Sequence, residues 1–221
     1  MNNFTFGVIR SYRKCSSLFL LMASVVCLFV AGCATSNISV AVHDTTSTFD
    51  TVVVDAGHGG KDSGVFKGGI AEKVAALDVA QRLDKKLRAA GFHTVMTRNG
   101  DYFVELNERA AISNRQENAI FVSIHFNDSR KRQINGVDTY YNSPVAEPLA
   151  RSIEQSLSKI APARGIHHAN YRVLRKNKYP AVLVECGFLS NGRDASEAKS
   201  AAYREKLATQ IVLAIKAQRG E

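Results

Sequence analysis

The stretch TVVVDAGHGG, residues 51–60, joins a β-branched apolar run to a glycine-rich segment that contains a histidine. Two further stretches have the same form, SIHFN at 123–127 and VECGFLSN at 184–191. Each predicts a buried strand that ends in a polar residue able to bind a metal or move a proton. In open α/β sheets, functional residues gather beyond the carboxyl ends of the strands. We therefore expect His58, His125 and Glu185 to share one site.

Strand and helix patterns alternate around these three stretches. The sequence predicts strands at 51–55, 93–97, 119–124, 136–141, 171–174 and 181–184. It predicts helices at 72–90, 105–117, 144–160 and 200–218, where apolar residues recur at helical spacing. The residues expected to face inward in the first two helices are Val74, Leu77, Ala80, Leu83, Leu87, Leu106, Ala110 and Ile112. This alternation predicts a single α/β domain, with a mostly parallel or mixed sheet of about six strands flanked by helices on both faces.

The first 32 residues have the pattern of a signal peptide. Three basic residues, Arg10, Arg13 and Lys14, precede an apolar run at 18–31 that is shorter than the roughly 20 residues of a membrane-spanning helix. The run ends in the small residues VAGC at 30–33, which resemble a bacterial lipobox in which Cys33 is diacylated. An ordinary signal peptide, or a short anchor in which Cys33 is incidental, is the alternative.

The predicted organisation follows from this amino-terminal segment. We expect a lipoprotein signal peptide at 1–32, a lipidated Cys33 with a flexible Ser- and Thr-rich linker at 33–48, and a catalytic domain at 49–221. The lipid would anchor the protein to a membrane of the cell envelope. Ala34 after the cysteine favours the outer membrane, facing the periplasm, in an organism with two membranes.

Charge and cysteine content limit the classes of partner and fold. Removing the basic residues of the signal peptide lowers the net charge from +9 to +6, which suits an anionic cell wall or membrane surface. Secretion and the absence of basic clusters mixed with aromatic residues argue against nucleic acid. Of the four cysteines, only Cys186 falls in the predicted domain, so no disulfide within that domain is expected.

Two histidines at separate strand ends suggest a zinc site, because catalytic zinc is held by three protein ligands of the His and carboxylate type. Glu72 is the best candidate for the third ligand, since it begins the helix that follows the glycine-rich loop. Its residue type also suits a partner of the helix dipole, and sequence spacing does not separate these two roles. Asp62 is the competing carboxylate, although its position suits a role in shaping the loop.

Glu185 follows an apolar run, where a buried carboxylate is costly unless it has a partner or a chemical role. Beside a metal it would act as a general base. The alternative is a salt bridge with Arg175 or Lys176.

Several motifs in this order resemble the zinc-dependent N-acetylmuramoyl-L-alanine amidases of the amidase type 3 family. The resemblance covers residues 51–217, and the motifs that carry it are VDAGHGG with Asp62 and Gly64, Glu72-Lys73, TRNGDYFVELNERAAISN at 97–114, SIHFN and PAVLVECGFLSN at 180–191. It implies a Zn²⁺ ion held by His58, Glu72 and His125, with Glu185 as the catalytic acid and base. It also implies framework roles for Arg98, Asp101 and Arg109.

The implied reaction is hydrolysis of the amide between N-acetylmuramic acid and L-alanine in peptidoglycan. Arg172, Arg175 and Lys176 are candidates to bind the carboxylates of the peptide, because they lie near Glu185 in the sequence. Some relatives insert a long inhibitory helix after the strand that follows the second histidine, whereas only residues 142–148 occupy this position here. No autoinhibitory helix is therefore expected, and the need for a protein activator stays open.

Two other classes of function remain to be compared with this one. A wall-binding lipoprotein without catalysis should have lost a ligand or Glu185, yet all four residues are present. A different zinc hydrolase acting on the same wall, such as a carboxypeptidase or a sugar deacetylase, would use the same metal and give different products.

Overall fold

Six strands form one mixed sheet in the order β4-β1-β5-β8-β6-β7 in the computed structural model, which describes residues 40–221. These strands are β1 (Thr51–Ala56), β4 (His93–Met96), β5 (Ala119–Asn127), β6 (Val137–Tyr141), β7 (Ala163–His168) and β8 (Ala181–Phe188). All neighbouring pairs are parallel except β6 and β8, which are antiparallel. The predicted α/β domain with a six-stranded mixed sheet is confirmed.

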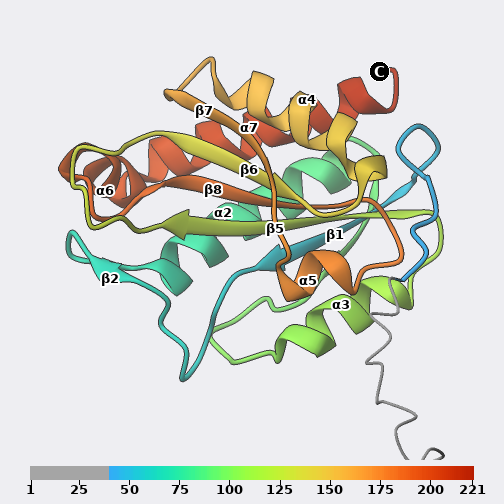
Figure 1. Cartoon of the computed structure of the whole chain (residues 1–221), viewed down its shortest axis with the longest axis horizontal. Helices are drawn as coiled ribbons and strands as arrows, with labels where there is room; N and C mark the ends of the chain where they lie inside the picture. Colours follow the sequence, from blue (N-terminus) through green and yellow to red (C-terminus); the bar gives the residue numbers. More distant parts are fainter. Residues whose placement is uncertain (1–39) are drawn as a thin grey trace, which may run out of the picture. The chain divides into compact units, whose positions relative to one another are not determined.

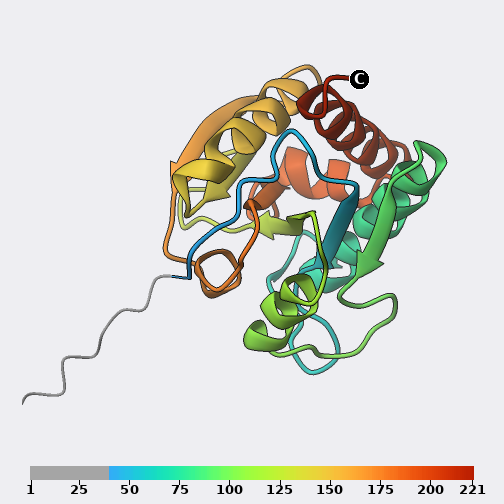
Figure 2. The same ribbon diagram turned by 90° about the vertical axis from the view of Figure 1, so that its right-hand side faces the viewer.

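Helices cover both faces of the sheet (Figures 1 and 2). One face packs against α2 (Glu72–Ala89), α4 (Glu147–Leu157) and α7 (Ala201–Gln218), and the larger core lies there. The opposite face carries a smaller core under α3 (Leu106–Asn114) and α5 (Arg172–Arg175). A short helix α6 (Gly192–Lys199) follows β8, and a 3-10 turn η1 (Pro144–Ala146) precedes α4. Within residues 40–221, no helix is long and apolar enough to cross a membrane.

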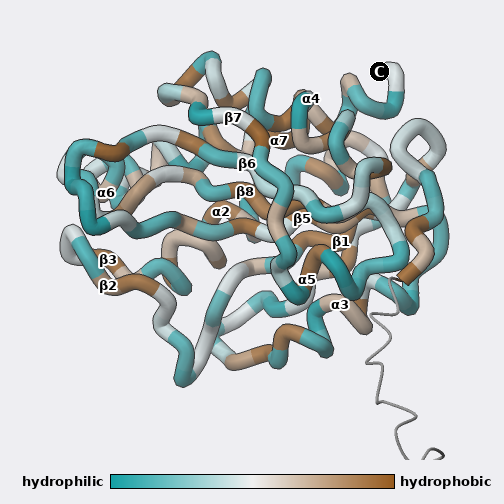
Figure 3. Tube along the Cα trace, viewed as in Figure 1, coloured by the Kyte–Doolittle hydropathy of each residue, from teal (hydrophilic) through white to brown (hydrophobic). Residues whose placement is uncertain are grey.

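A small hairpin stands apart from the main sheet. Its strands are β2 (Phe66–Lys67) and β3 (Ile70–Ala71), and they pair in antiparallel fashion between the first glycine loop and α2. Phe66 is 71% exposed, so an aromatic side chain faces solvent on this hairpin, where the hydropathy colouring of Figure 3 is brown.

One predicted strand is a helix in the structure, and one strand of the sheet was not predicted. Residues 171–174 were expected as a strand, but residues 172–175 form α5, which places Val173 and Leu174 in the smaller core. The sixth strand is instead β7, which contains His167 and His168 and which no predicted element covers. Because β7 is an edge strand with four exposed residues, it lacks the apolar alternation that identifies a strand.

Two predicted inward positions are also wrong, since Val74 is 55% and Leu106 is 50% exposed. In α2 the inward stripe contains Ala75, Ala76 and Val79 together with the predicted Ala80, Leu83 and Leu87. Small alanines allow α2 to pack closely on the sheet. The prediction followed the larger apolar residues and therefore chose Val74 instead of Ala75 and Ala76 for the first turn of the buried face.

The described part of the predicted linker packs against the domain. The Thr45 hydroxyl donates to the Ala119 carbonyl at 2.6 Å, and the His43 amide donates to the Lys178 carbonyl at 2.8 Å. Thr45 and Thr46 are buried, and Phe49 is fully buried. These contacts extend the domain to the amino-terminal side of residue 49. The predicted signal peptide, the predicted lipidation site Cys33 and residues 34–39 lie outside the described residues.

Candidate metal centre and catalytic pocket

His58 lies in the tight loop that leaves β1. It has a left-handed backbone conformation with φ of 59°, which is unusual for a residue other than glycine. Two contacts hold this conformation: Arg109 donates to the His58 carbonyl at 2.6 Å, and the His58 Nδ1 atom donates to Asp62 at 2.8 Å. The loop therefore fixes the imidazole, with its Nε2 atom free to face Glu72.

Glu72 is the first residue of α2 and is 3% exposed. Its Oε1 atom lies 3.0 Å from Nε2 of His58 and 2.8 Å from Nδ1 of His125. Backbone amides of Val65 and Phe126 also donate to this carboxylate, at 3.0 and 3.1 Å. Burial raises the pKa of Glu72, but the two imidazoles outweigh burial and hold it well below its usual range. Glu72 is thus an ionised carboxylate between two imidazoles, whatever it contributes to the helix dipole.

His125 lies within β5 instead of beyond its end, because the strand continues to Asn127. The ring packs against the backbone of Gly57, where an added Cβ atom would overlap the imidazole. The His58 and His125 rings meet edge to face with centroids 4.8 Å apart. Gly57 therefore allows the second imidazole to approach the first.

The three side chains form a donor set that fits zinc. One ligand atom from each of His58, Glu72 and His125 lies within 4.8 Å of the others, and no other group of this kind occurs in residues 40–221. Two imidazole nitrogens and one carboxylate oxygen are the ligand types of catalytic zinc sites that leave a position open. Asp62, the competing carboxylate, instead bonds the opposite nitrogen of His58, which is the usual position of an outer partner of a metal-binding histidine.

Glu185 is the neighbour of His125 in the next strand, because β8 also extends beyond its predicted end. Its Oε2 atom is inaccessible to solvent and has no hydrogen-bond partner among the described residues. Burial raises the pKa of Glu185 well above its ordinary value, and the nearby carboxylates of Glu72 and Asp138 raise it further. The alternative salt bridge with Arg175 or Lys176 does not occur in the described structure. A buried carboxyl group without a hydrogen-bond partner is suited to hold and transfer a proton.

A buried ionic network supports the loop beneath the metal ligands. Asp55, fully buried in β1, accepts hydrogen bonds from Arg109, Thr97 and Ser123. Arg98, also fully buried, donates to the carbonyls of Ala56 and Gly57.

Asp101 completes the support from the exposed side of the same loop. It accepts from the Gly60 amide at 2.8 Å and pairs with Lys73 at 2.8 Å. Arg98, Asp101 and Arg109 thus contact the glycine loop, as the resemblance implied. Sequence reasoning missed Asp55, although an acidic residue inside the apolar run TVVVDA was a visible signal.

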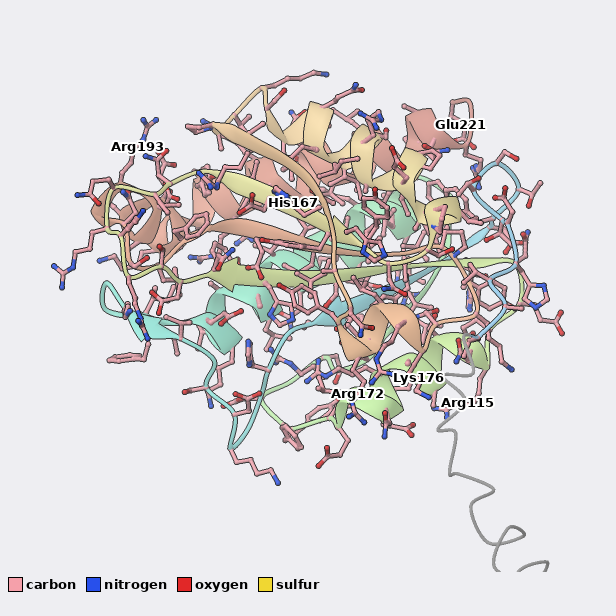
Figure 4. All side chains as sticks on the ribbon, in the orientation of Figure 1. Arg115, His167, Arg172, Lys176, Arg193 and Glu221 are labelled. Carbon is pink, nitrogen blue, oxygen red and sulfur yellow. The ribbon has the colours of Figure 1, made fainter. Side chains whose placement is uncertain are left out.

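The three candidate metal ligands and Glu185 line one cavity of about 610 Å³. Its walls combine apolar side chains from the segment before α3 and from α3, such as Phe103 and Leu106, with Tyr171 at the start of α5. Of the three predicted substrate-binding residues, Arg172 lines the cavity, whereas Arg175 and Lys176 are not among the lining residues. Figure 4 shows Arg172 and Lys176 on the α5 side of the sheet.

Comparison with known proteins gives one consistent result. Residues 52–217 match the Amidase_3 family, described as N-acetylmuramoyl-L-alanine amidase. The chain is 38% identical over 168 residues to N-acetylmuramoyl-L-alanine amidase LytC of Bacillus subtilis, covering 73% of this chain and 34% of that protein. It is 36% identical over 171 residues to the probable cell wall amidase LytH of Staphylococcus epidermidis, covering 75% of this chain and 57% of that protein. The matched region of the chain thus spans about a third of the length of LytC and just over half of the length of LytH.

Solved structures show the same fold over most of the chain. N-acetylmuramoyl-L-alanine amidase AmiC2 of Nostoc punctiforme superposes with a TM-score of 0.74 at 36% identity, covering 77% of this chain and 97% of that structure. The catalytic domain of CwlV, an N-acetylmuramoyl-L-alanine amidase from Bacillus (Paenibacillus) polymyxa, gives a TM-score of 0.74 at 32% identity, covering 76% and 97%.

Proposed function

Because this chain belongs to the Amidase_3 family of N-acetylmuramoyl-L-alanine amidases, we propose that it hydrolyses the amide between N-acetylmuramic acid and L-alanine in peptidoglycan, with zinc as cofactor. The observation that carries the proposal is the shared cavity of His58, Glu72, His125 and Glu185. A family member that only binds the wall would not need a buried, unpartnered carboxylate beside a complete set of metal donors.

His58, Glu72 and His125 would hold the zinc ion. Zinc at such a site supplies a Lewis acid that polarises carbonyl groups and acidifies water. Glu185 takes the proton of the attacking water and passes it to the departing amine of L-alanine. Burial raises the pKa of Glu185, which favours return of the proton to the departing amine.

The remaining residues of the site position the side chain and backbone of His58. Asp62 orients His58, and Arg109 holds the His58 carbonyl while it neutralises Asp55. The apolar side chains of Phe103 and Leu106 line the cavity and offer it an apolar wall.

The cellular location follows from the substrate and from the amino-terminal sequence. A peptidoglycan amidase acts in the cell envelope, in keeping with the cell wall amidases among its relatives. A lipid on Cys33 would anchor the protein to a membrane there, and the outer membrane is the proposed choice in an organism with two membranes. Metabolic labelling with an azido fatty acid tests the anchor, since Cys33→Ser should remove the label from the mature protein.

The activity is tested by mass spectrometry of the products after the purified protein digests sacculi. Free stem peptides with an unblocked amino-terminal alanine, together with intact glycan chains, are expected. Shortened peptides that remain attached to glycan would instead identify a peptidase, and loss of acetyl groups would identify a deacetylase. Absence of products from folded, zinc-loaded protein would contradict unaided hydrolysis.

A further inference from the structure

A second cavity, of about 560 Å³, lies next to the catalytic pocket. Three segments that are distant in sequence form it: the β2–β3 hairpin, the loop after β5 and the turn between β8 and α6. Figure 1 shows β2 and α6 at the same end of the sheet. The residues that line the cavity are Lys67, Gly68, Ser129, Arg130, Arg132, Leu189, Ser190, Gly192 and Ala195.

The cavity is strongly basic. Three cations and no acidic residue line it; Lys67 is paired with Asp128, so the uncompensated positive charge comes from Arg130 and Arg132. Within residues 40–221, neither Arg130 nor Arg132 has an ion-pair partner, and both are exposed. Clustered cations in a concave surface raise the local potential and attract anions. The planar guanidinium groups are suited to bidentate contacts with carboxylates.

Hydrogen bonds fix the loop that carries these arginines. The Ser129 amide donates to the Ser190 hydroxyl at 2.9 Å, and the Asn191 side chain donates to the Arg132 carbonyl at 2.8 Å. On the opposite wall, Gly68 packs so closely on Ala195 that an added Cβ atom would overlap it. The backbone of the cavity is therefore held on both sides, and only the cationic side chains are free to adjust to a ligand.

One ion pair separates this basic cavity from the catalytic pocket. Lys67 Nζ lies 2.7 and 2.8 Å from the two carboxylate oxygens of Asp128, and Asp128 lines the catalytic pocket. A peptide that continues from the reacting amide advances about 3.3 Å per residue. The two cavities therefore adjoin at this ion pair, and a stem peptide of several residues is suited to extend from one into the other.

We propose that the basic cavity binds free carboxylates of the stem peptide, through Arg130 and Arg132. This inference rests on the proposed function, which makes the stem peptide the part of the substrate on the amine side of the cleaved bond. It assigns to these two arginines the contact that the sequence suggested for Arg175 and Lys176, which do not line the catalytic pocket.

The test measures binding of a soluble stem peptide to the full-length protein by calorimetry, with the same peptide as its carboxamide for comparison. The unmodified protein should bind the acid form more tightly than the carboxamide. In Arg130→Gln/Arg132→Gln, affinity for the acid form should fall about 2- to 30-fold, as expected for the loss of two exposed charge contacts, and the preference should vanish. The variant Arg130→Lys/Arg132→Lys should keep part of the preference for the acid form.

The matched control is Arg115→Gln/Arg151→Gln, which removes the same charge from exposed positions that do not line the cavity. Its preference for the acid form should equal that of the unmodified protein. Figure 4 shows Arg115 at the far end of the sheet from Arg193, which lies in α6 beside the cavity.

Equal binding of the acid and carboxamide peptides to the unmodified protein, or a preference that survives in Arg130→Gln/Arg132→Gln, would overturn the inference. Because binding of the free peptide requires no hydrolysis, this outcome is separate from a failure of the proposed activity, which the sacculus digestion measures.

Discussion

The Asp62 carboxylate lies 2.8 Å from Nδ1 of His58, on the side of the ring opposite Glu72. This contact fixes the tautomer of His58 with its Nε2 atom available to a metal. We expect Asp62→Asn to weaken zinc affinity about 10- to 100-fold, the effect typical of losing an outer partner of a metal-binding histidine. Competition with a fluorescent zinc chelator measures the change. Asp50→Asn, at an exposed position outside the site, is the control, and equal affinities of the two variants would contradict the role of Asp62.

Gly57 provides a second test of the same centre. An alanine there would overlap the His125 ring, which has to move to accommodate it. We expect Gly57→Ala to lose zinc affinity and to destabilise the fold by about 1–3 kcal/mol, the usual cost of overpacking. Gly192→Ala is the matched control, because a Cβ atom there meets nothing within 4 Å. Normal zinc binding by folded Gly57→Ala would show that His125 is not confined as described.

Glu185→Gln should separate metal binding from catalysis. The amide keeps the size of the side chain but neither accepts nor returns a proton, so turnover should fall by roughly 10² to 10⁴. Zinc content, measured by plasma mass spectrometry, should stay near one ion per chain. A variant that keeps near-normal turnover would exclude Glu185 as the proton carrier.

Metal removal should abolish hydrolysis without unfolding the domain. Each imidazole contacts the Glu72 carboxylate, and Arg98 and Arg109 hold the surrounding backbone through hydrogen bonds that involve no metal ligand atom. Dialysis against a chelator should remove activity, zinc should restore it, and the circular dichroism spectrum should change little throughout. Hydrolysis that persists after complete metal removal would contradict the zinc mechanism.

Acid should destabilise the domain partly through Asp55. Burial raises the pKa of Asp55, but Arg109 and the hydroxyls of Ser123 and Thr97 outweigh burial and lower it below its ordinary value of 3.8. Because the folded-state pKa is lowered, Asp55 contributes its full stability above pH 3.8, and the contribution is lost as pH falls through the folded-state pKa. Urea unfolding between pH 7 and pH 3 measures this loss.

The variant Asp55→Asn isolates that contribution. It leaves Arg109 as a buried cation without its partner, so the free energy of unfolding at pH 7 should fall by about 3–5 kcal/mol. The decline in stability near pH 3 should also be smaller than in the unmodified protein. The same decline in both proteins would assign acid sensitivity to other groups.

The sequence predicted the central strands and the grouping of His58, His125 and Glu185 because apolar runs that end in polar residues leave strong local signals, whereas spacing alone did not separate the two roles of Glu72. The runs before His58 and Glu185 are apolar, and β1 and β8 are central strands buried on both faces. Where these strands end was less predictable. A polar residue inside a strand has the same local pattern as one just beyond it. The predicted strands therefore ended just before His125 and Glu185, whereas β5 continues to Asn127 and β8 to Phe188.

The elements that failed depend on tertiary position. Residues 171–174 were too few for periodicity to distinguish a helix from a strand, and the packing of Val173 and Leu174 determines the helix. The polar strand β7 is stable because it pairs with β6, a contact that no local pattern indicates. The basic cavity was missed for a similar reason, since its cations come from separate loops that only the fold brings together.

The place of β8 in the sheet has a consequence for biosynthesis. Although β8 is the last strand to be made, it lies between β5 and β6. A nascent chain that ends before residue 181 contains all three metal ligands, yet it lacks both Glu185 and the strand that joins β6 and β7 to the rest of the sheet. Truncated products and chains still in transit therefore cannot carry the complete proposed site, which forms only when nearly the whole polypeptide is available to fold.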